Sequence, residues 1–246
     1  MRGSKGSPTL VSNLRQWAKF LLWRTGTIRP DTSTRDDWNR SYAAGAWKRL
    51  ESIDELGHYS IIAGYAGAVA PQTVLDVGCG NGVLTRRLKA IPYRRYLGID
   101  LSDNAIAEAS KRHGDGRTFF RVCDAREFRS DESFDLVIFN ECLYFLGTPA
   151  EIMRSYSKLL APGGRMIVSM WAAPQNRAVW SEVQATMRIE DAVLVRNQLA
   201  GTGWTVKLLS PARDFIYTED SDLVRHFKSG AAPGPYPRRP NPEPAI

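Results

Sequence analysis

Hydrophobic and polar positions along the chain follow two alternating periods. Short apolar runs typical of buried strands lie at 73–77, 96–99, 119–122, 134–139 and 165–170. Stretches with helical spacing separate them at 83–90, 103–113 and 148–160. Regular alternation of strands and helices is typical of parallel strands joined by crossover helices. The pattern therefore predicts an α/β fold built on a mostly parallel sheet.

Further elements flank this alternating core. A helical pattern over 47–69 precedes the first strand, and another near 176–187 follows the fifth. Two more apolar runs lie near 192–196 and 205–209. The segment 201–203 between them is too short for a crossover helix, so we expect these two strands to pair antiparallel.

The net charge of +7 is concentrated at the N-terminus. Residues 1–30 contribute +6, residues 31–210 contribute +1, and residues 211–246 contribute zero. These shifts predict a basic N-terminal arm over 1–35, a folded domain over 36–210, and a C-terminal extension over 211–246. The extension is rich in Pro and Gly and is expected to be disordered at its end.

Charge and hydrophobic patterning limit the kinds of partner that the chain is expected to bind. A nearly neutral domain argues against a nucleic-acid substrate. The amphipathic pattern at 10–23 could lie on an anionic membrane surface. Because Leu22 and Trp23 blur its polar face, packing on the domain or on a partner subunit is favoured. The chain is interpreted as a monomer or a homodimer.

No apolar run approaches the roughly 18 residues of a spanning helix. The N-terminal apolar stretch is interrupted by polar residues and does not resemble a signal peptide. The three cysteines, Cys79, Cys123 and Cys142, lack metal-ligand spacing, and their odd number does not suit a disulfide framework. These features predict a cytoplasmic protein, and no bound metal is expected.

The strongest local signal is the segment 74–82, VLDVGCGNG, followed by a helical stretch. Glycines let the chain turn sharply and let its backbone approach a ligand. A dinucleotide fingerprint needs the spacing G-x-G-x-x-G, but here its third position is Val83. Asp76 would also repel a pyrophosphate and suits a positively charged group, such as the amino group of a methionine moiety.

A second signal is Asp100, at the end of the run YLGID. An acidic residue at the tip of the second strand can accept hydrogen bonds from both hydroxyls of a ribose. The alternative is a cap for the next helix. Ser102 or Asp103 could supply that cap, so the ribose interpretation is favoured.

With these motifs in hand, the sequence resembles the class I S-adenosylmethionine-dependent methyltransferases over about residues 36–210. The resemblance depends on LDVGCGNG, GIDLS, CDAREF, FDLVIFNECLYFL and LLAPGGRMIVSMW, in that order. NECLYFL is most similar to bacterial small-molecule enzymes, including those that N-methylate nodulation-factor sugars. The family implies a Rossmann-like sheet of seven strands with an antiparallel last strand and helices on both faces.

The resemblance also implies roles for particular residues in binding S-adenosylmethionine. Asp76 and the turn of Gly78, Cys79 and Gly80 would surround its methionine part. Asp100 would hold the ribose, and three residues would meet the adenine, namely Leu101, Asp124 and Ala125. The backbone carbonyl of Asn140 would accept from the amino group. Two aromatic residues ahead of the core, Tyr42 and Trp47, would belong to a lid.

Three residues are candidates for catalysis. Glu141 follows the fourth strand and is the best candidate for a general base or for orienting the acceptor, with a structural carboxylate as an equal alternative. Tyr144 could hydrogen-bond the acceptor, although packing is favoured. His58 is a weaker candidate base, because a lone helical histidine is more often packed or solvated.

These features favour transfer of a methyl group to an O or N atom of a small molecule. A methyltransferase that acts on a macromolecule and a non-catalytic cofactor-binding module are the alternatives. An NAD-dependent oxidoreductase is disfavoured by the glycine spacing. The acceptor itself is not encoded in any motif.

Overall fold

The computed structural model describes residues 33–212. The predicted arm helix at 10–23 and nearly all of the extension over 211–246 lie outside this range. The boundaries proposed at 36 and 210 stay predictions. Within residues 33–212, no helix is long and apolar enough to cross a membrane.

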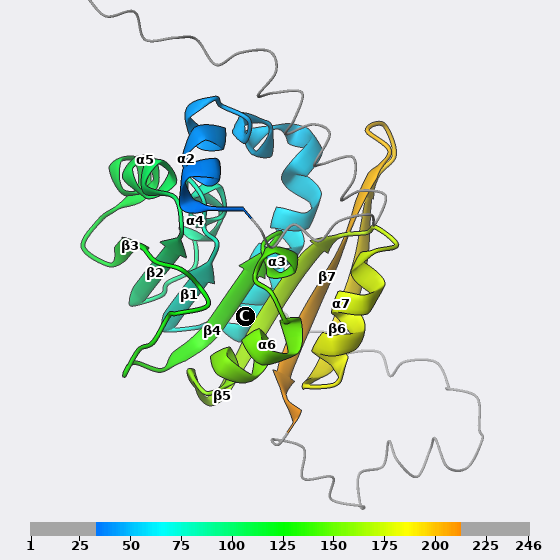
Figure 1. Cartoon of the computed structure of the whole chain (residues 1–246). Coiled ribbons are helices and arrows are strands. Elements are labelled where there is room, and N and C mark those ends of the chain that lie inside the picture. The colour runs from blue at the N-terminus through cyan, green and yellow to red at the C-terminus, as the bar shows by residue number, and fades with distance from the viewer. Residues whose placement is uncertain (1–32, 213–246) are drawn as a thin grey trace, which may run out of the picture. The chain divides into compact units, whose positions relative to one another are not determined.

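A single sheet of seven strands lies at the centre of the fold (Figure 1). Its strands are β1 (Thr73–Val77), β2 (Arg95–Asp100), β3 (Thr118–Val122), β4 (Phe134–Asn140), β5 (Leu160–Trp171), β6 (Met187–Asn197) and β7 (Thr202–Pro211). Their order is β3-β2-β1-β4-β5-β7-β6. Strands β1 to β5 pair in parallel, and β7 is antiparallel to both β5 and β6. The predicted Rossmann-like fold is confirmed.

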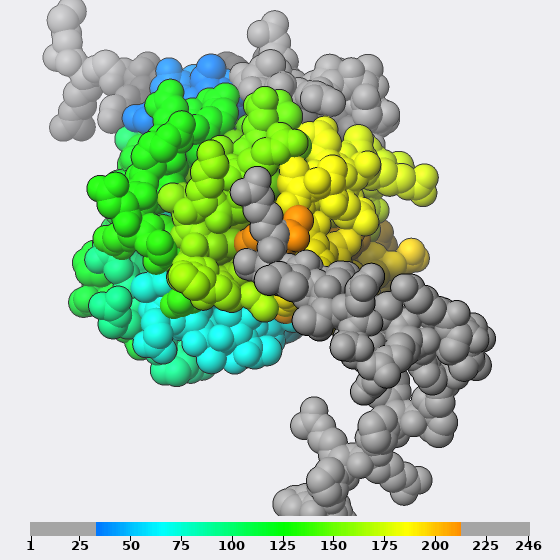
Figure 2. All heavy atoms as spheres, turned by 90° about the horizontal axis from the view of Figure 1, so that it is seen from below, coloured from blue at the N-terminus to red at the C-terminus, as the bar shows by residue number. Residues whose placement is uncertain are grey.

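Helices cover both faces of the sheet. They are α2 (Arg35–Ala43), α3 (Leu56–Val69), α4 (Val83–Leu88), α5 (Asp103–His113), α6 (Pro149–Ser157) and α7 (Asn176–Gln184). One buried cluster joins α3 and α4 to the sheet, and a second joins α6 and α7 to the sheet. Seen from below, α3 in cyan and α7 in yellow lie on different sides of the molecule (Figure 2). Burial on both faces explains why the central strands are almost wholly apolar.

The prediction of one helix over 47–69 is wrong. Two 3₁₀ turns, η1 (Lys48–Glu51) and η2 (Ile53–Glu55), precede α3, and Ser52 between them is extended, with φ −71° and ψ 164°. The apolar side chains whose spacing suggested one helix pack on two different surfaces. Trp47 and Leu50 line a cavity, whereas Ile62 packs in the core.

Helix α2 was not predicted, because its composition is strongly polar. It begins with a capping box, in which the Thr34 hydroxyl accepts from the Asp37 N–H and the Asp37 carboxylate accepts from the Thr34 N–H. In Figure 1, α2 and the blue to cyan segment after it lie over the end of the sheet to which the β1 and β2 arrows point. This is the edge where open α/β sheets bind ligands.

Candidate active site

A cavity of about 630 Å³ lies at the carboxyl ends of β1, β2 and β4, beneath α2 and η1. All the residues expected to bind the cofactor line it: Tyr42, Trp47, Asp76, Gly78, Cys79, Gly80, Asp100, Leu101, Asp124, Ala125 and Asn140. Glu141 and Tyr144 line it too. His58 is not among the lining residues. The topology therefore brings together groups that are up to about a hundred positions apart in the sequence.

The turn after β1 brings its backbone close to neighbouring side chains. Gly78 and Gly80 have φ angles of +68° and +55°, in the left-handed region that favours glycine. A Cβ on Gly78 would lie 2.6 Å from the Cβ of Cys142, and one on Gly80 would lie 2.5 Å from the Tyr42 hydroxyl. Both positions therefore favour glycine for their conformation, and a Cβ at either would displace a neighbouring side chain.

Asp76 lies at the base of this turn and is 1% exposed. Its Oδ2 accepts a hydrogen bond from the Tyr96 hydroxyl, which in turn accepts from Thr85. Its Oδ1 is buried and finds no partner among the described residues. Burial raises the pKa of Asp76 to about 7. A cationic group that reached Oδ1 would supply the missing partner and favour the ionised carboxylate.

Asp100 is fixed at the tip of β2 by backbone donors. Its Oδ2 accepts from the Gly80 N–H at 2.9 Å, and its Oδ1 accepts from the Ser102 N–H at 2.9 Å. Burial raises its pKa, and the backbone N–H groups oppose that rise. Ser102 caps α5 by accepting from the Ala105 N–H, so Asp100 does not fill that cap itself.

Asp124 follows β3 and pairs with Arg126, a residue that the sequence analysis did not single out. The Arg126 guanidinium donates to both carboxylate oxygens, from Nε at 2.9 and 3.1 Å and from a terminal nitrogen at 2.5 Å. These hydrogen bonds lower the pKa of Asp124. The pair places one fixed negative and one fixed positive charge on the cavity wall.

Helix α2 is docked onto α5 through Asn39, another residue that sequence reasoning missed. Its Oδ1 accepts from the Ser102 hydroxyl at 2.7 Å, and its Nδ2 donates to Asp103 at 3.0 Å. Asn104 donates to the Asn39 backbone carbonyl at 3.0 Å. These contacts hold the cavity-facing residues Trp38 and Tyr42 over the sheet.

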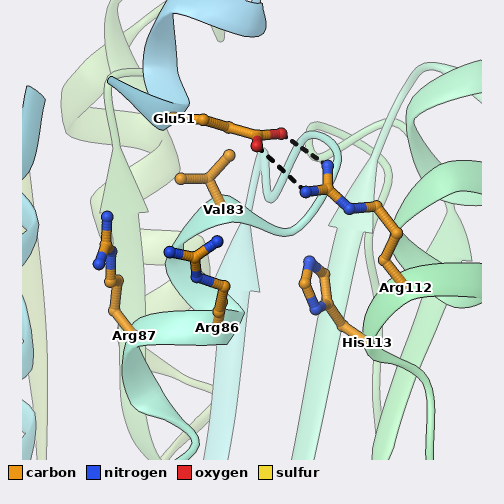
Figure 3. Close-up of a pocket in the computed structure, with 6 residues that line it drawn as sticks. All are labelled: Glu51, Val83, Arg86, Arg87, Arg112 and His113. Carbon is orange, nitrogen blue, oxygen red and sulfur yellow. Dashed lines mark hydrogen bonds and ion pairs between the residues drawn. The ribbon is translucent and has the colours of Figure 1, made fainter. Parts of the chain in front are cut away.

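A small notch between α4, α5 and η1 holds a second anchor (Figure 3). There the Arg112 guanidinium donates to both oxygens of Glu51, at 2.6 and 3.1 Å, and also to Glu108 at 2.9 Å. Arg86, Arg87 and His113 surround this pair. The notch thus joins η1 to α5, and its volume of about 10 Å³ leaves no room for a substrate.

Glu141 has an unusual backbone conformation, and both oxygens of its carboxylate accept hydrogen bonds. Its φ is +57°, which is rare for a residue other than glycine and is typical of functional sites. Oε2 accepts from the Tyr144 hydroxyl at 2.9 Å and from the Trp171 N–H at 3.1 Å, and Oε1 accepts from Ser169 at 3.4 Å. Burial raises its pKa to about 8 despite these donors.

His58 lies behind the cavity wall. It is 0% exposed and stacks on Trp204 and beside Tyr59, with ring centroids 4.7 and 4.2 Å apart. Burial, reinforced by Arg49, lowers its pKa to about 3. Neither ring nitrogen finds a hydrogen-bond partner among the described residues. A neutral imidazole without access to the cavity cannot contact the acceptor directly.

Glu55 is a second buried carboxylate of the cavity and was missed by the sequence analysis. It is 6% exposed, and its Oε1 accepts from the guanidinium of Arg49. Its Oε2 lies 3.9 Å from the Nδ1 of His58. Burial raises the pKa of Glu55, and Arg49 counteracts only part of that rise.

Aromatic rings close the cavity on the side of α2 and η1. Trp38 packs edge-on against Phe145 at 5.1 Å and tilted against Trp47 at 5.7 Å. Tyr144, Trp171 and Trp204 line the cavity as well. Such walls exclude water and favour a flat or cationic ligand.

The residues that line the cavity are suited to bind S-adenosylmethionine. The glycine turn leaves a cradle that a single Cβ at Gly78 or Gly80 would disturb. In the part of the chain that the structure describes, the buried Oδ1 of Asp76 has no hydrogen-bond donor. The carboxylate of Asp100 stands at the strand tip, where a ribose binds in related α/β folds. Among residues 33–212, no group of three or more metal-ligating side chains lies together.

Comparison with known proteins agrees with this geometry. The family described as "Methyltransferase domain" matches residues 70–210. Malonyl-[acyl-carrier protein] O-methyltransferase of Hahella chejuensis (strain KCTC 2396) is 30% identical over 210 residues, covering 81% of this chain and 74% of that protein. Nodulation protein S of Azorhizobium caulinodans is 26% identical over 198 residues, covering 74% and 90%.

A solved structure shows the same fold. The N-methyltransferase NodS from Bradyrhizobium japonicum WM9, in complex with S-adenosyl-L-homocysteine, superposes with a TM-score of 0.60 at 22% identity. The match covers 68% of this chain and 91% of that one. The chain therefore belongs to the methyltransferase domain family. It is an S-adenosylmethionine-dependent methyltransferase of the class I fold.

Proposed function

We propose that this enzyme methylates an oxygen or nitrogen atom of a small molecule bound in the aromatic part of the cavity. The observation that carries the proposal is the position of Glu141. A buried carboxylate in a left-handed backbone conformation lies beside the cofactor cradle, in a cavity of about 630 Å³. A cavity of this size holds a cofactor and a small acceptor, as is typical of sites for small ligands.

The residues of the turn and strand tips take the cofactor roles in this proposal. Asp76, Gly78, Cys79 and Gly80 surround the methionine part, and the Asn140 carbonyl accepts from its amino group. Asp100 holds the ribose. Leu101, Asp124 and Ala125 meet the adenine, and the lid residues Tyr42 and Trp47 close over it. The orphaned Oδ1 of Asp76 and the donors that fix Asp100 support these roles.

The bound cofactor supplies a methyl group already activated on a sulfonium. The protein's task is to align the acceptor atom with that group, which can contribute about 7–11 kcal/mol to lowering the barrier. Glu141 receives the proton that the acceptor loses, and Tyr144 and Trp171 hold its carboxylate in place. Trp38, Trp47 and Phe145 exclude water from the reacting atoms.

The curated relatives support a small acceptor without fixing its identity. Their names include trans-aconitate 2-methyltransferase and ubiquinone biosynthesis O-methyltransferase. They also include an enzyme that acts on malonyl-[acyl-carrier protein]. Of these two kinds of acceptor, we propose the free small molecule; transfer to a carrier-bound acceptor would contradict this proposal.

Labelled cofactor tests the size of the acceptor. The enzyme is incubated with methyl-tritiated S-adenosylmethionine and an extract of the cells that naturally make it, separated by size. We expect label in the fraction of small metabolites. Label confined to the protein or RNA fraction would contradict the proposal, and no acceptor in any fraction would favour a non-catalytic cofactor-binding module.

The role of Glu141 is tested by Glu141→Gln, with the exposed Glu151→Gln as the matched control. Removing the base should lower turnover about 100-fold, within the usual range for general-base catalysis. The dissociation constant for S-adenosylhomocysteine, measured by calorimetry, should change less than about twofold, since Glu141 is not part of the cofactor cradle. Turnover that survives in Glu141→Gln would make this carboxylate structural.

A further inference from the structure

The charge of the cavity is opposite to that of the chain. The sequence carries a net charge of +7. Six acidic residues line the cavity, Asp37, Glu55, Asp76, Asp100, Asp124 and Glu141, against the two arginines Arg49 and Arg126. With every group ionised, six negative and two positive charges leave a formal charge of −4. The bound cofactor, with two cationic groups and one carboxylate, compensates only one unit of it.

The excess negative charge is not spread evenly. Asp124 has Arg126 as its direct partner, and Asp37 pairs with Arg40 at 2.6 Å. Asp76 and Asp100 belong to the cofactor cradle. Glu55 and Glu141 remain, on η2 and after β4, both on the cavity wall. Among the described residues, Glu141 accepts hydrogen bonds from neutral donors only, and Glu55 pairs with the exposed Arg49.

Burial disfavours the ionised form of both carboxylates, and only Glu55 has a cationic partner, Arg49, among the described residues. Desolvation raises the pKa of both, and the charge of Glu55 raises the pKa of Glu141 further. The Nδ1 of His58 lies 3.9 Å from Glu55, neither ring nitrogen has a hydrogen-bond partner within residues 33–212, and a pKa of about 3 keeps the imidazole neutral. No cationic side chain of the described residues pairs with Glu141, so in the ligand-free enzyme a proton neutralises it, and a cationic ligand would favour its ionised form.

We infer that the acceptor is a protonated amine, held between Glu55 and Glu141 against the aromatic wall, and that the enzyme is an N-methyltransferase. The inference rests on the small-molecule function proposed above and narrows it to one chemical class. The faces of Tyr144, Trp171 and Trp204 suit an ammonium group, because aromatic rings attract cations. An acidic acceptor would face uncompensated carboxylates and be excluded by repulsion.

The reaction balances with the groups present. The ammonium of the acceptor gives one proton to the Glu141 carboxylate and becomes a neutral amine with a free electron pair. The amine nitrogen then bonds to the methyl carbon while the carbon–sulfur bond breaks and its electron pair goes to sulfur. The methylated product carries the positive charge that the sulfonium lost. Glu55 stays ionised beside Arg49 and holds the cation before and after transfer.

Ion exchange tests the inference without knowledge of the acceptor. The small-molecule extract is separated at pH 7 into cationic, neutral and anionic fractions, and each is incubated with enzyme and labelled cofactor. We expect the acceptor in the cationic fraction. Transfer only in the neutral or anionic fraction would overturn the amine assignment and leave the small-molecule function intact. Transfer in none of the three would contradict the proposed function itself.

Sinefungin probes the same charge in the binary complex. This analogue carries a primary amine where the cofactor carries the transferable methyl group, whereas S-adenosylhomocysteine has no charge there. The wild-type enzyme should bind sinefungin about tenfold more tightly than S-adenosylhomocysteine, as measured by calorimetry. Equal affinities would overturn the inference.

Single variants test whether the preference for sinefungin over S-adenosylhomocysteine comes from the two carboxylates. Glu141→Gln and Glu55→Gln should each reduce the preference for sinefungin at least about threefold, and the dissociation constant for S-adenosylhomocysteine should stay within about twofold. The exposed Glu151→Gln should leave the preference unchanged. A preference that persists in both cavity variants would show that backbone carbonyls alone bind the ammonium, contrary to the inference.

Discussion

At the scale of a single residue, Gly80 shows how the turn after β1 restricts which amino acids can occupy it. Its φ of +55° disfavours any side chain, and its missing Cβ makes room for the Tyr42 hydroxyl. Gly201 also has a positive φ, +65°, but nothing lies within 4 Å of the place where its Cβ would be. A comparison of the two glycines therefore distinguishes the cost of a left-handed backbone conformation from the cost of a steric clash.

Alanine at these two positions should have different effects. Gly201→Ala and Gly80→Ala should each destabilise the fold by about 1–2 kcal/mol, the cost of a left-handed conformation. Only Gly80→Ala should also weaken binding of S-adenosylhomocysteine, by at least about tenfold, since the new methyl group displaces the lid. Adding Tyr42→Phe should restore part of that affinity. Equal affinities of the two single variants would contradict the role of the close contact.

Glu141 should titrate far from other glutamates. Its pKa of about 8 predicts one ¹³C-carboxyl resonance in glutamate-labelled enzyme that shifts near pH 8 and is lost in Glu141→Gln. Because a general base must be ionised to accept a proton, the methyl-transfer rate should rise as the pH increases through about 8. A resonance that titrates near pH 4.5 would show that the carboxylate is solvated and is not a poised base.

At the scale of elements, the proposed lid, which consists of α2 and η1, depends on anchors outside the cavity. Asn39 docks α2 on α5, and Arg112 joins the η1 residue Glu51 to the same helix. An exposed ion pair contributes at most about 1 kcal/mol, so the second anchor should bias lid closure without determining the fold. The capping box at Thr34 adds order to α2 from within.

Arg112→Gln should raise the KM for S-adenosylmethionine about two- to fivefold, because the closed lid loses up to about 1 kcal/mol. Dissociation of S-adenosylhomocysteine in stopped-flow measurements should be faster by a similar factor. The control is Arg86→Gln, in the same notch, for which no ion pair is present within the described residues. If both variants behave alike, the notch acts through its general charge and not through the Glu51 pair.

At the scale of the whole molecule, buried acids couple ligand binding to stability. The pKa values of Asp76 and Glu141 are raised to about 7 and 8 from ordinary values near 4. The folded state therefore binds protons that the unfolded state releases. Their stabilising contribution is fully present below about pH 4 and is lost as the pH rises through 7 to 8.

Thermal unfolding measures this coupling. The Tm of the ligand-free enzyme should fall between pH 5 and pH 9, and the double variant Asp76→Asn, Glu141→Gln should fall less. Sinefungin should raise the Tm of the wild-type enzyme most at high pH, where its ammonium meets ionised carboxylates. A double variant with the same pH dependence as the wild type would show that other groups cause the loss.

The local pattern was enough to predict the alternating elements, the glycine turn, and the acidic tips of β1 and β2. Neighbouring residues define these features, and the carboxyl ends of parallel strands must meet at one edge. The helix over 47–69 was mispredicted because apolar spacing does not reveal that Trp47 and Ile62 pack on different surfaces. Thr34 and Asp37 offered a readable capping signal for α2 that went unused.

By itself, the sequence determined the fold and the cofactor class, because strand periodicity and the spacing of Gly78, Gly80 and Gly82 are local and chemically specific. Only the tertiary structure decided which further side chains join Glu141 at the proposed acceptor site. Glu55 and Glu141 are 86 positions apart in the sequence, and the fold places both on the wall of one cavity. The depth of burial that raises their pKa values is a property of packing, which no stretch of sequence encodes alone.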